Sequence, residues 1–116
     1  MITIRPADKA FLEEIAAPAG ADAMVLRDSD GTVFGHALFV VQGDTVEILH
    51  VQSQEPLMVE GLIRSVLNTG DCRGAVRGLC RVQVLQPVLK RLEFAPDEDG
   101  WTVSIDAFFH GDCHCQ

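Results

Sequence analysis

Several common features are missing from this chain of 116 residues, and each absence narrows what the protein can be. No apolar run approaches the roughly 20 residues that a membrane-spanning helix needs. The N-terminal residues carry no basic stretch ahead of a long apolar core, so they do not resemble a secretion signal. Tyrosine does not occur, which removes the phenol group as a proton donor. From these absences we expect a protein of the cytoplasm that does not bind membranes.

Positive charge is also scarce, because the formal net charge is −8 at pH 7. This balance argues against general binding of nucleic acids, which depends on neutralising phosphates. Most of the basic residues nevertheless fall in one stretch, opposed there only by Asp71, and we call them the basic cluster: Arg64, Arg73, Arg77, Arg81, Lys90 and Arg91. Two interpretations stay open, a solvated basic face or a local attraction for a phosphorylated ligand.

The composition, 47% hydrophobic and 22% charged, is typical of a soluble globular domain. Apolar alternation and Gly-containing turns predict strands at residues 2–5, 23–27, 32–41, 45–51, 75–82 and 101–109. Helical spacing predicts a short helix capped by Asp8 and two longer helices, at residues 56–67 and 85–92. We expect Asn68-Thr69-Gly70 to end the first long helix, Pro87 to lie in the first turn of the second, and Gly35 to mark a bulge or bend.

The strands at 45–51 and 75–82 flank the helix at 56–67, and such a unit pairs its strands in parallel through a right-handed crossover. The earlier strands follow one another through short turns, as in an antiparallel meander. The predicted fold class is therefore α+β, with a central mixed sheet, an antiparallel N-terminal meander, a parallel pair of strands and flanking helices. We expect one domain at residues 1–109 and a Cys/His-rich tail at residues 110–116.

Strict alternation along residues 45–51 assigns each side chain to a face of the sheet. It predicts one face with Glu47, Leu49 and Val51, and the other with Val46, Ile48 and His50.

This order of elements resembles the GNAT superfamily of acetyl-CoA-dependent N-acetyltransferases. The resemblance covers residues 2–109. It depends on four segments in order, which are Ile2-Thr3-Ile4-Arg5-Pro6, Gly35-His36-Ala37, the helix after Glu55-Pro56, and Leu89-Lys90-Arg91-Leu92-Glu93-Phe94.

The resemblance implies a site for acetyl-CoA. In that family the fourth strand carries a bulge and separates from the fifth, the pantetheine arm lies in the gap, and the pyrophosphate lies at the start of the next helix. The implied cofactor-binding residues here are Leu49, Val51, Gly61, Leu62 and Arg64. Of the glycine-rich pyrophosphate loop only Gly61 matches, because Met58 replaces the basic or amide residue and Ile63 the last small residue, while Glu60 adds a charge of the wrong sign.

The resemblance also implies a general base on the fourth strand, for which Glu47 is the first candidate and His50 the second. The structural alternatives are an exposed strand carboxylate and an edge or core histidine. The Tyr that often protonates the departing thiolate has no counterpart, since Leu89 occupies its place. The segment before residue 23 has room for about one helix where the family has two, so the acceptor pocket should be reduced or open.

The C-terminal tail gathers thiols and imidazoles within six residues, namely His110, Cys113, His114 and Cys115. These groups suit zinc or copper(I), and Cys72 or Cys80 could complete a tetrahedral zinc site. A flexible reduced tail with adventitious metal affinity, or a redox-active thiol, is the alternative.

Three functions therefore compete. The first is transfer of an acetyl group from acetyl-CoA to an amine, and the second is a ligand- or partner-binding module of the same fold without catalysis. The third is a metal- or thiol-dependent accessory protein that acts through the tail. The acceptor and the oligomeric state stay open.

Overall fold

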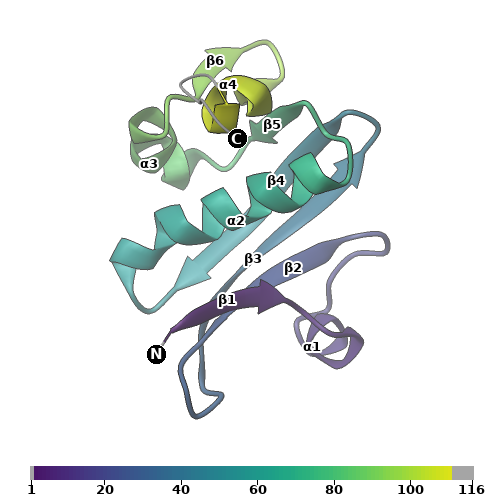
Figure 1. Ribbon diagram of the computed structural model, residues 1–116, viewed down its shortest axis with the longest axis vertical. Helices are drawn as coiled ribbons and strands as arrows, with labels where there is room; N and C mark the ends of the chain where they lie inside the picture. The colour runs from purple at the N-terminus through teal and green to yellow at the C-terminus, as the bar shows by residue number, and fades with distance from the viewer. Residues whose placement is uncertain (1, 111–116) are drawn as a thin grey trace.

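The computed structural model describes residues 2–110, without the side chain of His110. In this range seven strands form one sheet in the order β1-β2-β3-β4-β5-β7-β6 (Figure 1). The strands are β1 Thr3–Pro6, β2 Asp22–Arg27, β3 Val33–Gln42, β4 Thr45–Ser53, β5 Arg77–Cys80, β6 Ala95–Asp97 and β7 Gly100–Ser104. The helices are α1 Lys9–Glu14, α2 Val59–Cys72, α3 Gln86–Arg91 and α4 Ile105–His110, with 3-10 turns η1 Pro56–Met58 and η2 Gln83–Leu85.

The predicted fold class is confirmed. Strands β1 to β4 form an antiparallel meander, and β4 pairs in parallel with β5 after the crossover through α2. Asp8 caps α1 as expected, because its carboxylate accepts a hydrogen bond of 2.9 Å from the backbone N–H of Phe11. None of the helices in the described part is long and apolar enough to span a membrane.

Helix α2 continues through the predicted stop at Asn68-Thr69-Gly70 and ends at Cys72. The reason is that Gly70 serves packing instead of termination. A Cβ atom built on Gly70 would lie 2.7 Å from Cγ1 of Val46, so the missing side chain lets α2 approach β4 closely. Gly35 has a similar role in the sheet, since a Cβ there would lie 2.5 Å from the carbonyl oxygen of Gln52.

The C-terminal third differs from the prediction in three places. The strand expected at 75–82 is shorter and consists of β5 alone. The 3-10 turn η2 and helix α3 replace the continuous helix expected at 85–92, and Pro87 lies in the first turn of α3 as expected. The strand expected at 101–109 ends at Ser104, and α4 follows. The Ser104 hydroxyl accepts a hydrogen bond of 3.3 Å from the backbone N–H of Ala107 at the start of α4, and Ile105 is buried at helical spacing from Phe108 and Phe109.

A bulge at Leu49 corrects the predicted faces of β4. Phe39 pairs with Ile48 and Leu38 pairs with His50, so Leu49 is an extra residue without a partner on β3. Side chains beyond the bulge are therefore displaced to the opposite face. Val46, Ile48 and Val51 pack toward the core under α2, whereas Glu47 and His50 share the other face.

A second register shift, between Leu26 and Arg27, leaves Phe34 as the extra residue of β3, next to the expected position at Gly35.

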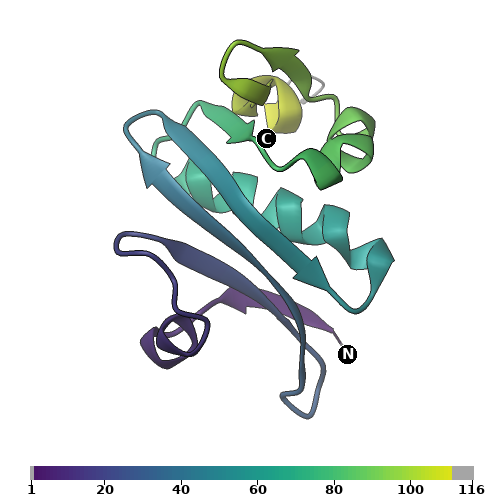
Figure 2. The same ribbon diagram turned by 180° about the vertical axis from the view of Figure 1, so that it is seen from behind.

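Helix α2 covers one face of the sheet and supplies the main core. Leu62, Ile63, Val66 and Leu67 are fully buried against strand residues that include Leu26, Phe39, Val46 and Ile48. Figure 2 shows the opposite face, where α1 lies near one end and no drawn helix lies in front of the middle of β3 and β4. We call this the open face.

Helix α1 packs on the open face through an aromatic contact. The ring of Phe11 lies edge-on to that of His36, with centroids 5.6 Å apart, and His36 in turn lies 5.7 Å from the ring of His50. Burial, with a smaller contribution from the charge of His50, lowers the pKa of His36 below 6.5. His36 is therefore a group whose protonation opposes folding.

Replacement of Gly70 by Ala should destabilise the protein by about 1–3 kcal/mol, because the new methyl group meets Val46 in a closed core. Gly61→Ala is the matched control in the same helix, where the nearest atom is 3.5 Å away. The control should be neutral or stabilising by up to about 1 kcal/mol. Urea unfolding followed by circular dichroism measures both changes, and equal effects would contradict the packing role of Gly70.

Stability should fall as the pH drops below about 6.5, because the unfolded chain then binds more protons at His36 than the folded protein does. Melting temperatures between pH about 7.5 and about 5.5 should decrease less in His36→Gln than in the wild type. His50→Gln should give an intermediate slope, since it removes only the neighbouring charge. Identical slopes in all three proteins would show that His36 does not couple to folding.

Candidate functional site

Strands β4 and β5 separate where the bulge interrupts β4. Their pairing runs from Thr45 with Arg77 to Ile48 with Cys80 and then stops, whereas β4 continues to Ser53. In Figure 1 the chain leaves β5 toward α3 while β4 runs in a different direction. Among the described residues no strand therefore pairs with the second half of β4 on this side. Leu49 and Val51, predicted to bind a cofactor, lie in this half, which offers unpaired backbone groups.

The start of α2 follows β4 at the same end of the sheet. No side chain caps this helix, and the backbone of η1 accepts hydrogen bonds at its start instead: the N–H of Val59 donates to the carbonyl oxygen of Pro56, and the N–H of Met58 donates to that of Glu55 at 2.9 Å. Gly61 is half-buried, and a Cβ atom there would meet side-chain atoms of Ile4 and Met58 at 3.5 and 3.7 Å, whereas the side chain of Leu62 is fully buried in the core. Leu62 can therefore offer a ligand only its backbone. Glu60 in the first turn accepts a hydrogen bond of 2.9 Å from Nε of Arg91, which links α2 to the end of α3.

Arg64 lies one turn further along α2 and points toward α4. Its guanidinium is 5.2 Å from the ring centroid of Phe108. A cavity of about 650 Å³ opens here, between α2, α3 and α4, and both Arg64 and Arg91 line it. Glu93, a non-glycine residue with φ of 70°, lines the same cavity. Two guanidinium groups, one of them from α2, thus line one hollow.

Glu47 lies on the open face, and its side chain is 20% exposed. Its Oε2 accepts a hydrogen bond of 3.3 Å from Nη1 of Arg81. The carboxylate is therefore paired with a cation and mostly covered, in contrast to the exposed strand carboxylate that was one alternative. His50 lies on the same face and is exposed, beside the half-buried His36. The bulge at Leu49 is what brings both predicted bases to one side of the sheet.

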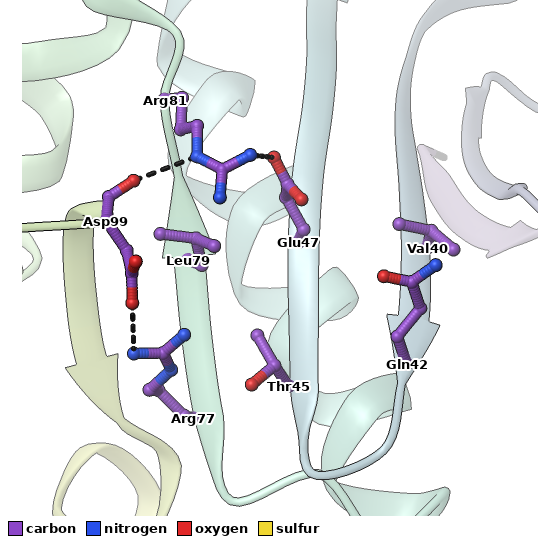
Figure 3. A pocket seen from close by; sticks show the side chains of 8 residues that line it. All are labelled: Val40, Gln42, Thr45, Glu47, Arg77, Leu79, Arg81 and Asp99. Atoms are coloured by element: carbon purple, nitrogen blue, oxygen red, sulfur yellow. Dashed lines mark hydrogen bonds and ion pairs between the residues drawn. The ribbon is translucent and has the colours of Figure 1, made fainter.

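A smaller cavity of about 240 Å³ lies over Glu47 on the open face (Figure 3). We call it the open-face pocket, and its lining residues are Val40, Gln42, Thr45, Glu47, Arg77, Leu79, Arg81 and Asp99. Sequence reasoning missed Arg81 and Asp99 as neighbours of Glu47. Strand alternation would have placed Arg77, Leu79 and Arg81 on one face, but their register against Glu47 depends on the paired sheet.

The basic cluster does not form a free positive surface. Four of its arginines pair with carboxylates from other parts of the chain: Arg73 with Asp22, Arg77 with Asp99, Arg81 with Glu47, and Arg91 with Glu60. Lys90 lies over the ring of Trp101, as Arg64 does over Phe108. The solvated-face interpretation is therefore too simple, because these cations connect separate elements.

The predicted metal ligands Cys113, His114 and Cys115 lie outside the described residues, as does the side chain of His110, whose backbone ends α4. Zinc binding by the tail stays a prediction. Within the described residues no group of three or more His, Cys, Asp or Glu side chains is placed to hold a metal ion. Cys80 is fully buried and burial raises the pKa of its thiol, so it is a poor candidate to complete such a site. Cys72 is exposed.

Comparison by sequence finds no relatives, since no protein-family model and no curated protein matches this chain. Comparison by structure finds proteins of similar fold. The chain is similar to mutant forms of the spermidine/spermine N-acetyltransferase SpeG from Vibrio cholerae, with a TM-score of 0.74 at 10% identity over 97% of this chain and 99% of that chain.

Two further solved structures are similar. YhbS from Escherichia coli, a GNAT family N-acetyltransferase in complex with CoA, has a TM-score of 0.68 at 15% identity, over 94% of this chain and 85% of that chain. An acetyltransferase from Trypanosoma brucei has a TM-score of 0.65 at 15% identity, over 84% of this chain and 95% of that chain. At these identities the similarity establishes the fold: the chain has the GNAT fold that its order of elements predicted.

Proposed function

We propose that this protein transfers an acetyl group from acetyl-CoA to an amine. The observation that supports this most directly is the separation of β4 from β5 at Ile48 and Cys80, with the bulge at Leu49. The pantetheine arm of CoA is narrow and carries amide groups, so it needs backbone partners on one side, and the second half of β4 offers that backbone. The YhbS complex with CoA, which shares the fold, supports the same ligand here.

The phosphate groups of CoA would lie at the start of α2. The N-terminal end of α2, which η1 extends back to Pro56, carries a partial positive charge and has no side-chain cap. Gly61 adds no side chain at this turn, and Arg64 and Arg91 supply two guanidinium groups that line the cavity between α2, α3 and α4. Glu60 acts against an anion, both by its own charge and because it occupies Arg91. The residues present therefore fit CoA, with Glu60 as an opposing charge.

Acetyl-CoA would supply an acetyl group already activated as a thioester. The chain's own contribution is to orient the reactants and to remove a proton from the amine. Backbone N–H groups near His50 and Val51 can donate to an acyl oxygen. Glu47 and His50 lie on the open face and can accept the amine proton. With no tyrosine in the chain and Leu89 fully buried, a proton for the leaving thiolate would come from water.

A binding module without catalysis is the second candidate function. Glu47 is held by Arg81, and the place of the usual tyrosine belongs to the core residue Leu89. Titration calorimetry with acetyl-CoA, together with release of free CoA thiol in the presence of amines, separates the two functions. Binding with turnover supports the transferase. Binding without turnover for every amine supports the module, and no heat at all excludes CoA as the ligand.

Glu60→Gln should tighten CoA by up to about fivefold, because it removes one opposing charge, worth about 1 kcal/mol or less at this exposure. Glu14→Gln on α1 is the control with the same change of net charge and should leave the dissociation constant unchanged. Calorimetry at low and high salt measures both. An equal effect of the two substitutions would mean that only net charge matters and that CoA does not approach Glu60.

Glu47→Gln and His50→Gln should identify the general base. The variant that lacks the base should lose about 100-fold or more in kcat/KM, whereas the other should lose less than about tenfold. Acetyl-CoA affinity should be retained by both, since neither side chain lies on the α2 face. Thiol release across a pH series is the assay. If both variants keep the wild-type rate while the wild type turns over, neither side chain accepts the proton.

A further inference from the structure

The open-face pocket has a pattern of charge that the proposed transfer reaction does not require. Its charged groups alternate in one connected row (Figure 3). Nη1 of Arg77 lies 3.2 Å from Oδ2 of Asp99, Nε of Arg81 donates to the backbone oxygen of Asp99 at 2.8 Å, and Nη1 of Arg81 donates to Glu47 at 3.3 Å. Two cations and two anions thus line a cavity of about 240 Å³.

Arg81 and Glu47, the last pair in this row, each keep unused hydrogen-bonding capacity that faces the pocket. In Figure 3 a third guanidinium nitrogen of Arg81 points toward the centre of the pocket and makes no interaction with the other residues drawn. The second oxygen of Glu47 is similarly without a partner among them. Arg81 is 59% exposed, so its long side chain can turn, whereas Glu47 is only 20% exposed and stays in place. The pocket can therefore add one carboxylate and one ammonium group.

The charge balance also selects against other ligands. A polyamine or another simple cation would meet two guanidinium groups, and a simple carboxylate would meet Glu47 and Asp99. A molecule with an ammonium and a carboxylate group close together matches both sets, because it replaces one internal ion pair with two external ones. The volume is below the roughly 300–1,000 Å³ of sites for drug-sized ligands, so the ligand is small.

We infer that the open-face pocket binds a small zwitterion of the amino-acid type, with its carboxylate on Arg81 and its amine beside Glu47. The inference rests on the proposed function, of which it names the acceptor class. It separates this chain from the structurally similar SpeG enzyme, named for spermidine and spermine, which are polycations. Arg81 is then a binding residue. When the carboxylate of the acceptor pairs with Arg81, it replaces Glu47 there and so releases the Glu47 carboxylate.

The test uses nuclear magnetic resonance of the ¹⁵N-labelled protein without CoA, with the standard L-amino acids as probes at millimolar concentration. At least one amino acid should shift the amide signals of residues 45–47, 77–81 and 99. The methyl ester of that amino acid, a cation, and its N-acetyl derivative, an anion, should each bind at least about tenfold more weakly. If no amino acid shifts these signals, or if the ester binds equally well, the inference is wrong.

The variant Arg81→Gln should weaken that amino acid at least about tenfold, and Arg81→Lys should recover part of the loss. Arg73→Gln, which removes a cation paired with Asp22 on another part of the sheet, is the control and should change nothing. Unchanged circular dichroism will establish that Arg81→Gln folds. Equal weakening by both glutamine variants would overturn the assignment of Arg81.

Thiol release from acetyl-CoA with the same probes separates this inference from the proposed function. If the zwitterion binds but no acetyl transfer occurs, the inference about the open-face pocket is supported and the proposed transferase function is wrong. Transfer to the ester at the same kcat/KM as to the free amino acid keeps the transferase and rejects the zwitterion.

Discussion

The separation of β4 from β5 is the constraint on which the rest of the site depends. One extra residue, Leu49, ends the regular pairing at Ile48 and Cys80 and leaves the second half of β4 without a strand on that side. The same residue reverses the faces beyond it, so that Val51 packs under α2 while His50 joins Glu47 on the open face. In the proposed reaction this one bulge would provide both a place for an extended ligand and two candidate bases on the open face.

Paired charges, and not a free positive surface, organise the edges of this site. Arg91 connects α3 to Glu60 on α2, and Arg81 connects β5 to Glu47 on β4. Such pairs contribute little to stability at these exposures, because solvent screens them. In the proposed function these pairs would be exchangeable, because each holds a group that a charged ligand could replace. An acidic protein can in this way keep local affinity for anions without a basic face.

The sequence predicted the order of the elements well because the signals are local. Alternation found β2 to β4, helical spacing found α2, and Asp8 marked the start of α1. The errors have a common cause: the secondary structure at these positions depends on contacts with residues that are far away in the sequence. Gly70 alone predicts a helix stop, but in the structure it lets α2 pack closely against Val46. Phe108 and Phe109 were predicted in a strand, but they belong to α4 and pack against the core. Glu47 and His50 were identified as candidates, but Arg81 and Asp99 could be placed beside Glu47 only through the register of β4, β5 and the turn before β7.

The central claim is that the gap beside the second half of β4 receives the arm of acetyl-CoA. Amide chemical shifts of the ¹⁵N-labelled protein during titration with acetyl-CoA test it most directly, because they report position as well as affinity. The account predicts the largest shifts at residues 49–53 of β4, at residues 59–61 of α2, and at residues 81–85 after β5. Shifts confined to the open-face pocket around Arg77 and Asp99, or no shifts at saturating acetyl-CoA, would contradict it.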